Sequence, residues 1–150
     1  CDVVLMHRQG EPRTMQADPR YGDVVTEVRD ALLARAQAAL TAGVARERIW
    51  LDPGIGFGKT LAHNLALTAN LSALVETGFP VLFGASRKRI IQAVDASAID
   101  PLDRLGGSLA LALEAARSGA AIVRVHDVRE TVQALRLQAA VAKVAAHSEP

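Results

Sequence analysis

The sequence has little of what marks several other classes of protein. Cys1 is the single cysteine in 150 residues, which excludes an intramolecular disulfide and is typical of a reducing compartment. No apolar stretch approaches the ~18 residues that cross a bilayer. No charged segment followed by a short apolar run resembles a signal peptide. We therefore expect a cytoplasmic protein with no membrane partner.

Charge and aromatic side chains are also sparse. The formal net charge is +1 and no basic run occurs, so no nucleic-acid partner is expected. Aromatic residues make up 3% of a chain that is 50% hydrophobic, so the core must be aliphatic. The length is ample for one core. Because the chain begins with Cys1 rather than methionine and enters an apolar run at once, we expect it to be a piece of a longer protein.

Short apolar runs alternate with longer segments of helical spacing. The short runs are residues 2–6, 48–51, 80–83 and 121–125. Consecutive apolar residues predict parallel strands that are buried on both faces. The segments with helical spacing are residues 24–40, 61–74, 105–116 and 128–141, with Asp23 and Asp127 as expected N-caps and residues 7–22 and 94–103 as long loops. The pattern predicts an α/β fold of four β/α units. Such units form either half of a (β/α)8 barrel or a small doubly wound sheet.

Residues 51–60, LDPGIGFGKT, are the most informative segment. Asp52 ends an expected strand, and three glycines within five positions follow it. Glycine allows positive φ angles and a close approach of the backbone to a ligand. The helix expected from Leu61 offers free N–H groups to an anion. The segment is therefore typical of a binding rim.

Two familiar phosphate-binding patterns do not fit this segment. A P-loop, G-x-x-x-x-G-K-[ST], requires glycine where Pro53 stands. A dinucleotide fingerprint requires a small residue where Lys59 stands. A different ligand site and a glycine-rich connection without a ligand both remain open.

Polar residues follow each expected strand, and ligands of parallel α/β proteins bind where the strands end. The residues at these ends are Met6, His7, Asp52, Gly84, Ser86, Arg87, Lys88, Arg124 and His126. Structural interpretations remain open: Asp52 as a turn former, the histidines as packing residues, and residues 86–88 as a solvated helix start. Arg124 falls inside an apolar run, so it requires a partner there.

The residues at these ends favour one kind of ligand. No spacing of His, Cys and carboxylate predicts a metal site held by the protein, and no Ser-His-Asp set is evident. The set suits a planar heterocycle whose donors meet Asp52, with an anionic group near Arg124 and His126.

Five motifs together resemble one known family. They are VLMHRQGEPRTMQ at residues 4–16, LDPGIGFGK at 51–59, GASRK at 84–88, GGS at 106–108 and RVHDV at 124–128. In this order and spacing they are similar to dihydropteroate synthase, the folate-pathway enzyme inhibited by sulfonamides. The resemblance runs from residue 1 to about residue 140.

The resemblance implies a (β/α)8 barrel in which residues 1–150 are the C-terminal half, with strands five to eight. It implies the condensation of 6-hydroxymethyl-7,8-dihydropterin diphosphate with 4-aminobenzoate, which gives 7,8-dihydropteroate and pyrophosphate. It further implies Mg²⁺ on the diphosphate and a homodimer.

The resemblance also assigns roles to the residues at the strand ends. Asp52 accepts hydrogen bonds from the pterin, and Lys88 donates to its carbonyl side. Arg124 stacks on the pterin and helps to hold the anion, and His126 contacts the diphosphate. Lys88 and Arg124 are the expected catalytic residues. The remaining members of the expected substrate site are Met6 and Phe57 as walls, Gly84, and Ser86 with Arg87 on the aminobenzoate side.

Two departures from the family pattern are visible. Arg89 stands where many members have a serine that helps to bind the aminobenzoate carboxylate. An expected first barrel half, with further pterin contacts and two mobile loops, is absent from these 150 residues. A related pterin-binding methyltransferase and a non-catalytic half-barrel are the alternative interpretations, with an isolated fragment expected to be inactive.

Overall fold

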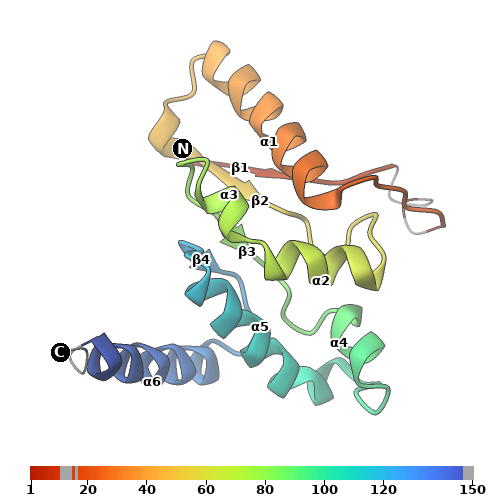
Figure 1. The fold of residues 1–150 in the computed structure, drawn as a ribbon, viewed down its shortest axis with the longest axis vertical. Coiled ribbons are helices and arrows are strands. Elements are labelled where there is room, and N and C mark those ends of the chain that lie inside the picture. The colour runs from red at the N-terminus through yellow and green to blue at the C-terminus, as the bar shows by residue number, and fades with distance from the viewer. Residues whose placement is uncertain (11–14, 16, 147–150) are drawn as a thin grey trace.

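The computed structural model describes residues 1–10, 15 and 17–146. Four short strands alternate with helices along the chain (Figure 1). The strands are β1 (Val3–Met6), β2 (Ile49–Asp52), β3 (Leu82–Phe83) and β4 (Ile122–Val123). The α-helices are α1 (Val24–Thr41), α2 (Leu61–Ala69), α3 (Ser72–Val75), α4 (Arg89–Val94), α5 (Leu105–Arg117) and α6 (Val128–Ala146). Two 3-10 turns are η1 (Arg46–Arg48) and η2 (Pro101–Arg104).

All the strand pairs in the described residues are parallel. β1 pairs with β2 in a register that places Met6 beside Asp52, and β3 pairs with β4. A single bridge, Leu51 to Val81, joins the two pairs, and Leu51 N donates to Pro80 O at 2.9 Å. The spatial order is therefore β1-β2-β3-β4, and the four carboxyl ends lie along one rim. The predicted α/β alternation with parallel strands is confirmed.

The prediction that every strand is buried on both faces is wrong for the two outer strands. Val4 of β1 is 48% exposed and Ile122 of β4 is 41% exposed, whereas Ile49 and Leu51 of β2 are fully buried. The reason is position: within the described residues, β1 and β4 each have a strand on one side only.

The helix boundaries follow local chemistry. Asp23 caps α1 as predicted, since its side chain accepts from Val25 N. The predicted helix over 61–74 is instead divided into α2 and α3. Asn70 ends α2, and its side-chain amide donates to Ala66 O at 2.9 Å, a local bond that competes with the helix. The predicted loop over 94–103 is also partly wrong, because η2 forms at its end with Asp100 as the cap.

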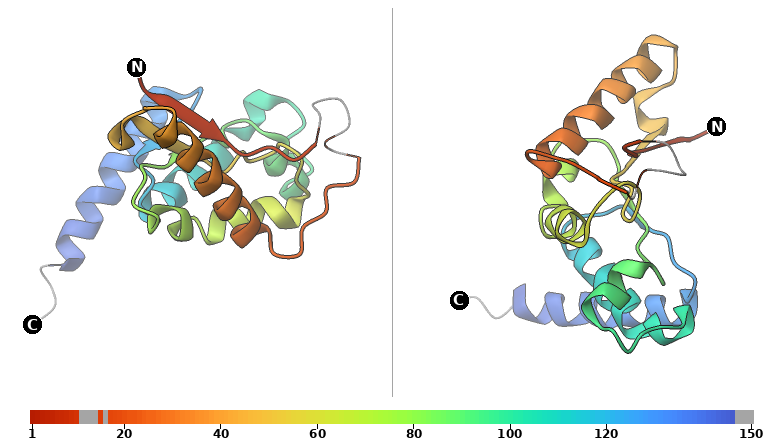
Figure 2. Two further views of the ribbon diagram at one scale, coloured as in Figure 1. Left: turned by 90° about the horizontal axis from the view of Figure 1, so that it is seen from above. Right: turned by 90° about the vertical axis from the view of Figure 1, so that its right-hand side faces the viewer.

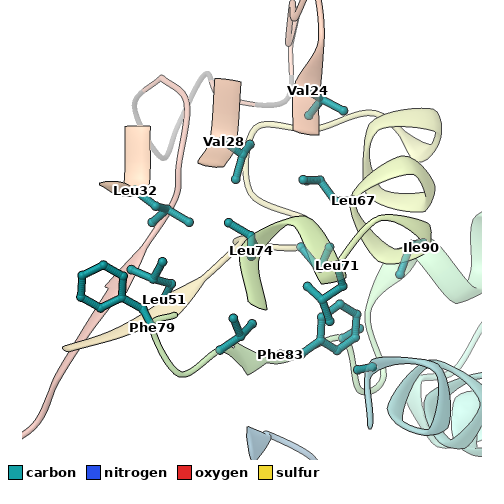
Figure 3. Close-up of a cluster of buried hydrophobic side chains, with 14 of the residues drawn as sticks. Val24, Val28, Leu32, Leu51, Leu67, Leu71, Leu74, Phe79, Phe83 and Ile90 are labelled. Atoms are coloured by element: carbon teal, nitrogen blue, oxygen red, sulfur yellow. The ribbon is translucent and has the colours of Figure 1, made fainter. Parts of the chain in front are cut away.

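Buried aliphatic side chains from α1 pack against side chains of β2, α2 and α3 (Figure 3). Val28 and Leu32 of α1 and Leu51 of β2 are fully buried, and Phe83 of β3 is 2% exposed. The helical spacing of Val24, Val28 and Leu32 places one face of α1 on this cluster. This packing places β2 and β3, whose ends carry the candidate site, on one shared hydrophobic core.

The two ends of the chain differ in their packing. α1 lies beside β1 and β2 at one end of the molecule, whereas at the other end α5 lies beside β4 and α6 packs on α5 (Figure 1). α6 extends away from the rest (Figure 2), and several of its apolar side chains are exposed, among them Leu137, Val141 and Val144. None of the helices in the described residues has the length and apolar character needed to cross a membrane.

Candidate functional site

The ends of β1 and β2 are joined directly by backbone hydrogen bonds. Met6 lies beside Asp52, and His7 N donates to Asp52 O at 2.9 Å. The ends of β3 and β4 are joined in the same way, since Arg124 N donates to Phe83 O at 2.8 Å. Because the strands are parallel, these pairs bring residues far apart in the sequence to one rim.

Asp52 is the central carboxylate of this rim. It is 3% exposed, and its Oδ1 accepts from Gly54 N at 2.8 Å. Burial raises the pKa of Asp52, and the Gly54 N–H, Lys88, Arg124 and Lys59 act in the opposite direction. Its Oδ2 lies 3.8 Å from Arg124 Nη2. The rim thus holds a buried acceptor within a cationic surrounding.

Lys88 reaches the rim from the residue before α4. Its Nζ donates to Ile55 O and lies 4.6 Å from the centre of the Phe57 ring. Burial lowers the pKa of Lys88 to about 8, although Asp52 raises it. Lys88 and the half-buried Phe57 are therefore adjacent, as a donor and an apolar wall.

Arg124 differs from its sequence interpretation as a buried charge inside a strand. It follows the last residue of β4, and its side chain is 59% exposed. Gly84 makes room for it, because a Cβ at Gly84 would lie 3.0 Å from Arg124 Nε and 3.1 Å from Nη2. The guanidinium therefore lies over the Gly84 backbone and is accessible to a ligand.

The glycine loop after β2 packs against the chain that follows β1. Gly54 and Gly58 have φ angles of +68° and +63°. A Cβ at Gly54 would lie 1.8 Å from His7 O, and one at Gly58 would lie 2.4 Å from Gln9 O. Only glycine permits this approach. The sequence predicted a close approach of this backbone to a ligand, whereas at Gly54 and Gly58 the close approach is to the protein's own backbone.

Two buried side chains, Lys59 and Asn64, form hydrogen bonds to the backbone of this loop. Lys59 is 4% exposed, and its Nζ contacts His7 Nδ1 at 3.0 Å, Gly54 O at 3.1 Å and Phe57 O at 3.0 Å. Asn64 of α2 accepts from Gly56 N at 2.7 Å. Burial, followed by the charge of Lys59, lowers the pKa of His7 to about 4. His7 is therefore neutral at neutral pH and accepts a hydrogen bond from Lys59.

The segment after β3 is tied to the segment after β4. Ser86 is 6% exposed, and its Oγ contacts both the backbone N and Nδ1 of His126, at 3.2 and 3.0 Å. Arg87 donates twice to Asp127, and this pair lowers the pKa of Asp127. The sequence predicts Asp127 as a helix cap, whereas its carboxylate is held by Arg87.

Arg87 has a left-handed backbone, with a φ of 58° that is uncommon for a residue other than glycine. Its N–H donates to Ser108 Oγ at 2.9 Å, and its carbonyl accepts from Arg104 Nη1 at 2.9 Å. Arg104 is 5% exposed and also bonds Ala98, Ile99 and Gln92. These bonds fix the turn that directs Ser86 and Lys88 to the rim.

A cavity of about 450 Å³ lies beside this rim. Its lining includes Phe57 and Gly56 from the glycine loop, Lys88, and Arg89 with Ile90 from α4. Asp52 and Arg124 lie outside this lining, so Lys88 and Phe57 mark the boundary between the cavity and the Asp52 carboxylate. The cavity has the size of a small-molecule pocket.

The residues of the rim do not suit a metal ion held by the protein. Across residues 1–10, 15 and 17–146, no three His, Cys, Asp or Glu side chains come together in a way that would hold one. Asp52 is surrounded by cations, and Asp127 is paired with Arg87.

Sequence reasoning missed the inward-facing residues. Lys59, Asn64 and Arg104 are absent from the residues that the sequence predicted for the site. Asn64 had a detectable signal, since it lies three residues before the buried Leu67 and so shares the buried face of α2. The motif at 4–16 falls partly outside the described residues.

The fold and this rim define an α/β protein of the kind that binds ligands at the carboxyl ends of parallel strands. The sequence profile of the pterin binding enzyme family matches residues 1–126. The chain belongs to the pterin binding enzyme family.

Individual relatives agree with this family. The dihydropteroate synthase of Escherichia coli K12 is 48% identical over 136 residues, which cover 90% of this chain and 47% of the relative. The crystal structure of Burkholderia cenocepacia dihydropteroate synthase complexed with 7,8-dihydropteroate has a TM-score of 0.88 and 50% identity, with 97% of this chain and 54% of that one covered.

The dihydropteroate synthase of Thermus thermophilus in complex with 4-aminobenzoate has a TM-score of 0.87 and 47% identity. The matched region covers 93% of this chain and 56% of that structure. The chain spans about half the length of the curated relatives it matches.

Proposed function

We propose that the protein is a dihydropteroate synthase, which condenses 6-hydroxymethyl-7,8-dihydropterin diphosphate with 4-aminobenzoate to give 7,8-dihydropteroate and pyrophosphate. The observation that carries the proposal is the buried Asp52 acceptor beside Lys88 and Arg124. Two structurally similar dihydropteroate synthases hold 7,8-dihydropteroate and 4-aminobenzoate, which supports the same ligands here.

The proposal places the four β/α units as strands five to eight of a (β/α)8 barrel, with residues 1–150 as its C-terminal half. The parallel order β1-β2-β3-β4 supports this placement. So do the half-exposed outer strands, because a barrel continues on both sides of them. The similar solved structures are about twice as long as the part they share with this chain.

In this proposal the pterin binds over the Asp52 carboxylate. Asp52 accepts from the ring N–H groups, Lys88 donates to the carbonyl side, and Arg124 stacks on the ring. Met6 and Phe57 are the apolar walls, and Gly84 leaves room for Arg124. Asp52 is a buried carboxylate whose Oδ1 accepts from Gly54 N and whose Oδ2 lies 3.8 Å from Arg124 Nη2. Its remaining lone pairs suit N–H donors of a ligand, because hydrogen bonds to a carboxylate are strong in a dry site.

The reaction forms a bond from the aminobenzoate nitrogen to the pterin methylene carbon, and the bond from that carbon to the diphosphate oxygen breaks. The nitrogen loses a proton, and pyrophosphate leaves with the bonding electron pair. Arg124 and His126 stabilise the charge that develops on the leaving oxygen. Mg²⁺ enters as part of the diphosphate substrate, since the described residues form no cage for it.

The aminobenzoate binds in the cavity beside Phe57, Lys88 and Arg89. Ser86 and Arg87 support this side through His126 and Asp127. Arg89 provides a guanidinium that can pair with a carboxylate through two hydrogen bonds. This pairing replaces the serine contact of many family members.

The protein is further proposed to be a cytoplasmic homodimer. Exposed apolar side chains gather around α4, η2 and the start of α5, and they support a self-association surface there. They are Leu65, Val94, Ile99, Leu102 and Leu105. The single cysteine favours the reducing cytoplasm.

The test is pyrophosphate release by the complete natural protein, followed with both substrates and with each omitted. Dihydropteroate synthase activity predicts release that requires 4-aminobenzoate and a dihydropteroate product seen by mass spectrometry. A pterin-binding methyltransferase predicts no release but methyl transfer from a methylated folate. A non-catalytic protein predicts neither reaction, and either of these two outcomes overturns the proposal.

We expect the affinity for the pterin diphosphate to fall on both sides of neutral pH. Above about pH 8, both Lys88 and Lys59 lose their protons, because burial lowers the pKa of each to about 8, and two positive donors are lost. Towards acid pH, Asp52 takes up a proton earlier than an ordinary aspartate, because burial raises its pKa. Calorimetric titrations across this range check the expectation. Lys88→Arg should remove the contribution of Lys88 to the alkaline limb and leave that of Lys59, so the limb should become less steep; a limb identical to that of the wild type in midpoint and steepness would contradict the role of Lys88.

A further inference from the structure

Lys59 has an ammonium group that is turned into the protein. The side chain belongs to a Gly-Lys-Thr sequence typical of phosphate loops, yet Lys59 is 4% exposed. Its Nζ lies 3.0–3.1 Å from His7 Nδ1, Gly54 O and Phe57 O. A lysine ammonium has three N–H donors, so these three acceptors account for all of them. Lys59 therefore acts on the protein rather than on a bound phosphate.

The Gly54 residue links Lys59 to the Asp52 carboxylate. Gly54 O accepts from Lys59 Nζ at 3.1 Å, and Gly54 N donates to Asp52 Oδ1 at 2.8 Å. The peptide groups on both sides of the Gly54 Cα are therefore each fixed by a hydrogen bond to a side chain. Because Oδ1 is occupied in this way, the Asp52 carboxylate is fixed with Oδ2 on the side of Arg124, 3.8 Å away.

The glycine loop needs this external support. Gly54, Gly56 and Gly58 all have positive φ angles, and glycine has more conformational freedom to lose than any other residue. The Lys59 ammonium donates hydrogen bonds to the carbonyls of Gly54 and Phe57 in this loop and to the His7 side chain after the end of β1. It therefore fixes the loop between two strand ends with a single buried cation.

We propose that Lys59 is a positioning residue for pterin binding. Its internal ammonium orders residues 54–57, and through Gly54 it sets the orientation of the Asp52 carboxylate. This inference rests on the proposed pterin site at Asp52. It adds a residue whose effect on the pterin is transmitted through Gly54 and Asp52, although Lys59 also contributes to the lining of the neighbouring cavity.

A double-mutant cycle tests the inference in the complete natural protein. The dissociation constant of the pterin diphosphate is measured by calorimetry for the wild type, Lys59→Met, Asp52→Asn and the double variant. Lys59→Met is expected to weaken binding by about tenfold, because an ordered charged hydrogen bond to the loop is lost. In the double variant the loss should exceed that of Asp52→Asn by less than about twofold, since Lys59 acts through Asp52.

Two results would overturn the inference: unchanged affinity in Lys59→Met, or losses that add fully in the double variant. A residue that only stabilises the fold would lower the unfolding temperature and leave the affinity of the folded protein unchanged, whereas a residue that acts on the pterin independently of Asp52 would give the additive result. Lys143→Met on the exposed face of α6 is the matched control and should bind like the wild type. Where Lys59→Met fails to fold in a thermal unfolding scan, Lys59→Gln replaces it in the same cycle, since its amide keeps two N–H donors. If the wild type itself binds no pterin, the proposed function fails rather than the role of Lys59 alone.

Discussion

Replacing Lys88 with alanine in the complete natural protein is expected to lower the turnover number by roughly thirtyfold to several thousandfold, since loss of a charged donor in a desolvated site costs about 2–5 kcal/mol. Lys88 lies where the glycine loop, the Phe57 ring and the Asp52 charge meet. Alanine removes the donor proposed to meet the carbonyl side of the pterin and a positive charge that interacts with Asp52. Steady-state kinetics with both substrates measure the effect.

Lys143→Ala is the matched control for this prediction. Lys143 lies on the exposed side of α6, away from the strand ends, and its replacement should leave the turnover number near that of the wild type. Thermal unfolding of both variants separates a loss of activity from a loss of fold. Equal turnover numbers in the two variants would show that the rim is wrongly placed.

Residues 1–150 expressed alone are expected to produce no detectable dihydropteroate. In the described residues, β1 and β4 each have one unpaired edge, and Val4 and Ile122 are exposed beside these edges. Exposed strand edges with apolar flanks promote association. We expect the isolated residues to aggregate or to pair with a second copy through these edges.

Co-expression of residues 1–150 with the N-terminal half of a related barrel tests whether the isolated chain is inactive because its site is incomplete or because the site is wrongly assigned. If the proposed first barrel half supplies the rest of the pocket and excludes water, some activity should return. Size-exclusion chromatography measures the association of the chains, and a product assay measures the formation of dihydropteroate. A soluble monomer with substantial activity would show that the four β/α units form a competent site by themselves.

Much of the architecture could be predicted because it depends on local apolar pattern. The four apolar runs became strands, and the spacing of Val24, Val28 and Leu32 gave the buried face of α1. The collection of polar residues at one rim followed from parallel strand direction alone. These features need no knowledge of where individual side chains point.

The errors and omissions concern side-chain direction and competition at single residues. Arg124 lies after a very short strand, and its side chain reaches solvent, which an apolar run does not reveal. Asn70 divides a helix whose apolar spacing is continuous. The left-handed turn at Arg87 depends on Ser108 and Arg104, which are 21 and 17 residues away. Lys59 faces inward because of acceptors that only the fold brings together.

The most direct test of the central claim is the affinity of the complete natural protein for 6-hydroxymethyl-7,8-dihydropterin diphosphate, compared with that of Asp52→Asn. Asparagine keeps the size of the side chain but replaces one acceptor oxygen with an NH2 donor. A donor would then face the N–H donors of the pterin ring, and no hydrogen bond could form there. Such a change in a buried pair costs about 2–5 kcal/mol. Calorimetry should therefore show binding at least about tenfold weaker. An unchanged dissociation constant in a folded Asp52→Asn protein would contradict the assignment of Asp52 as the pterin anchor.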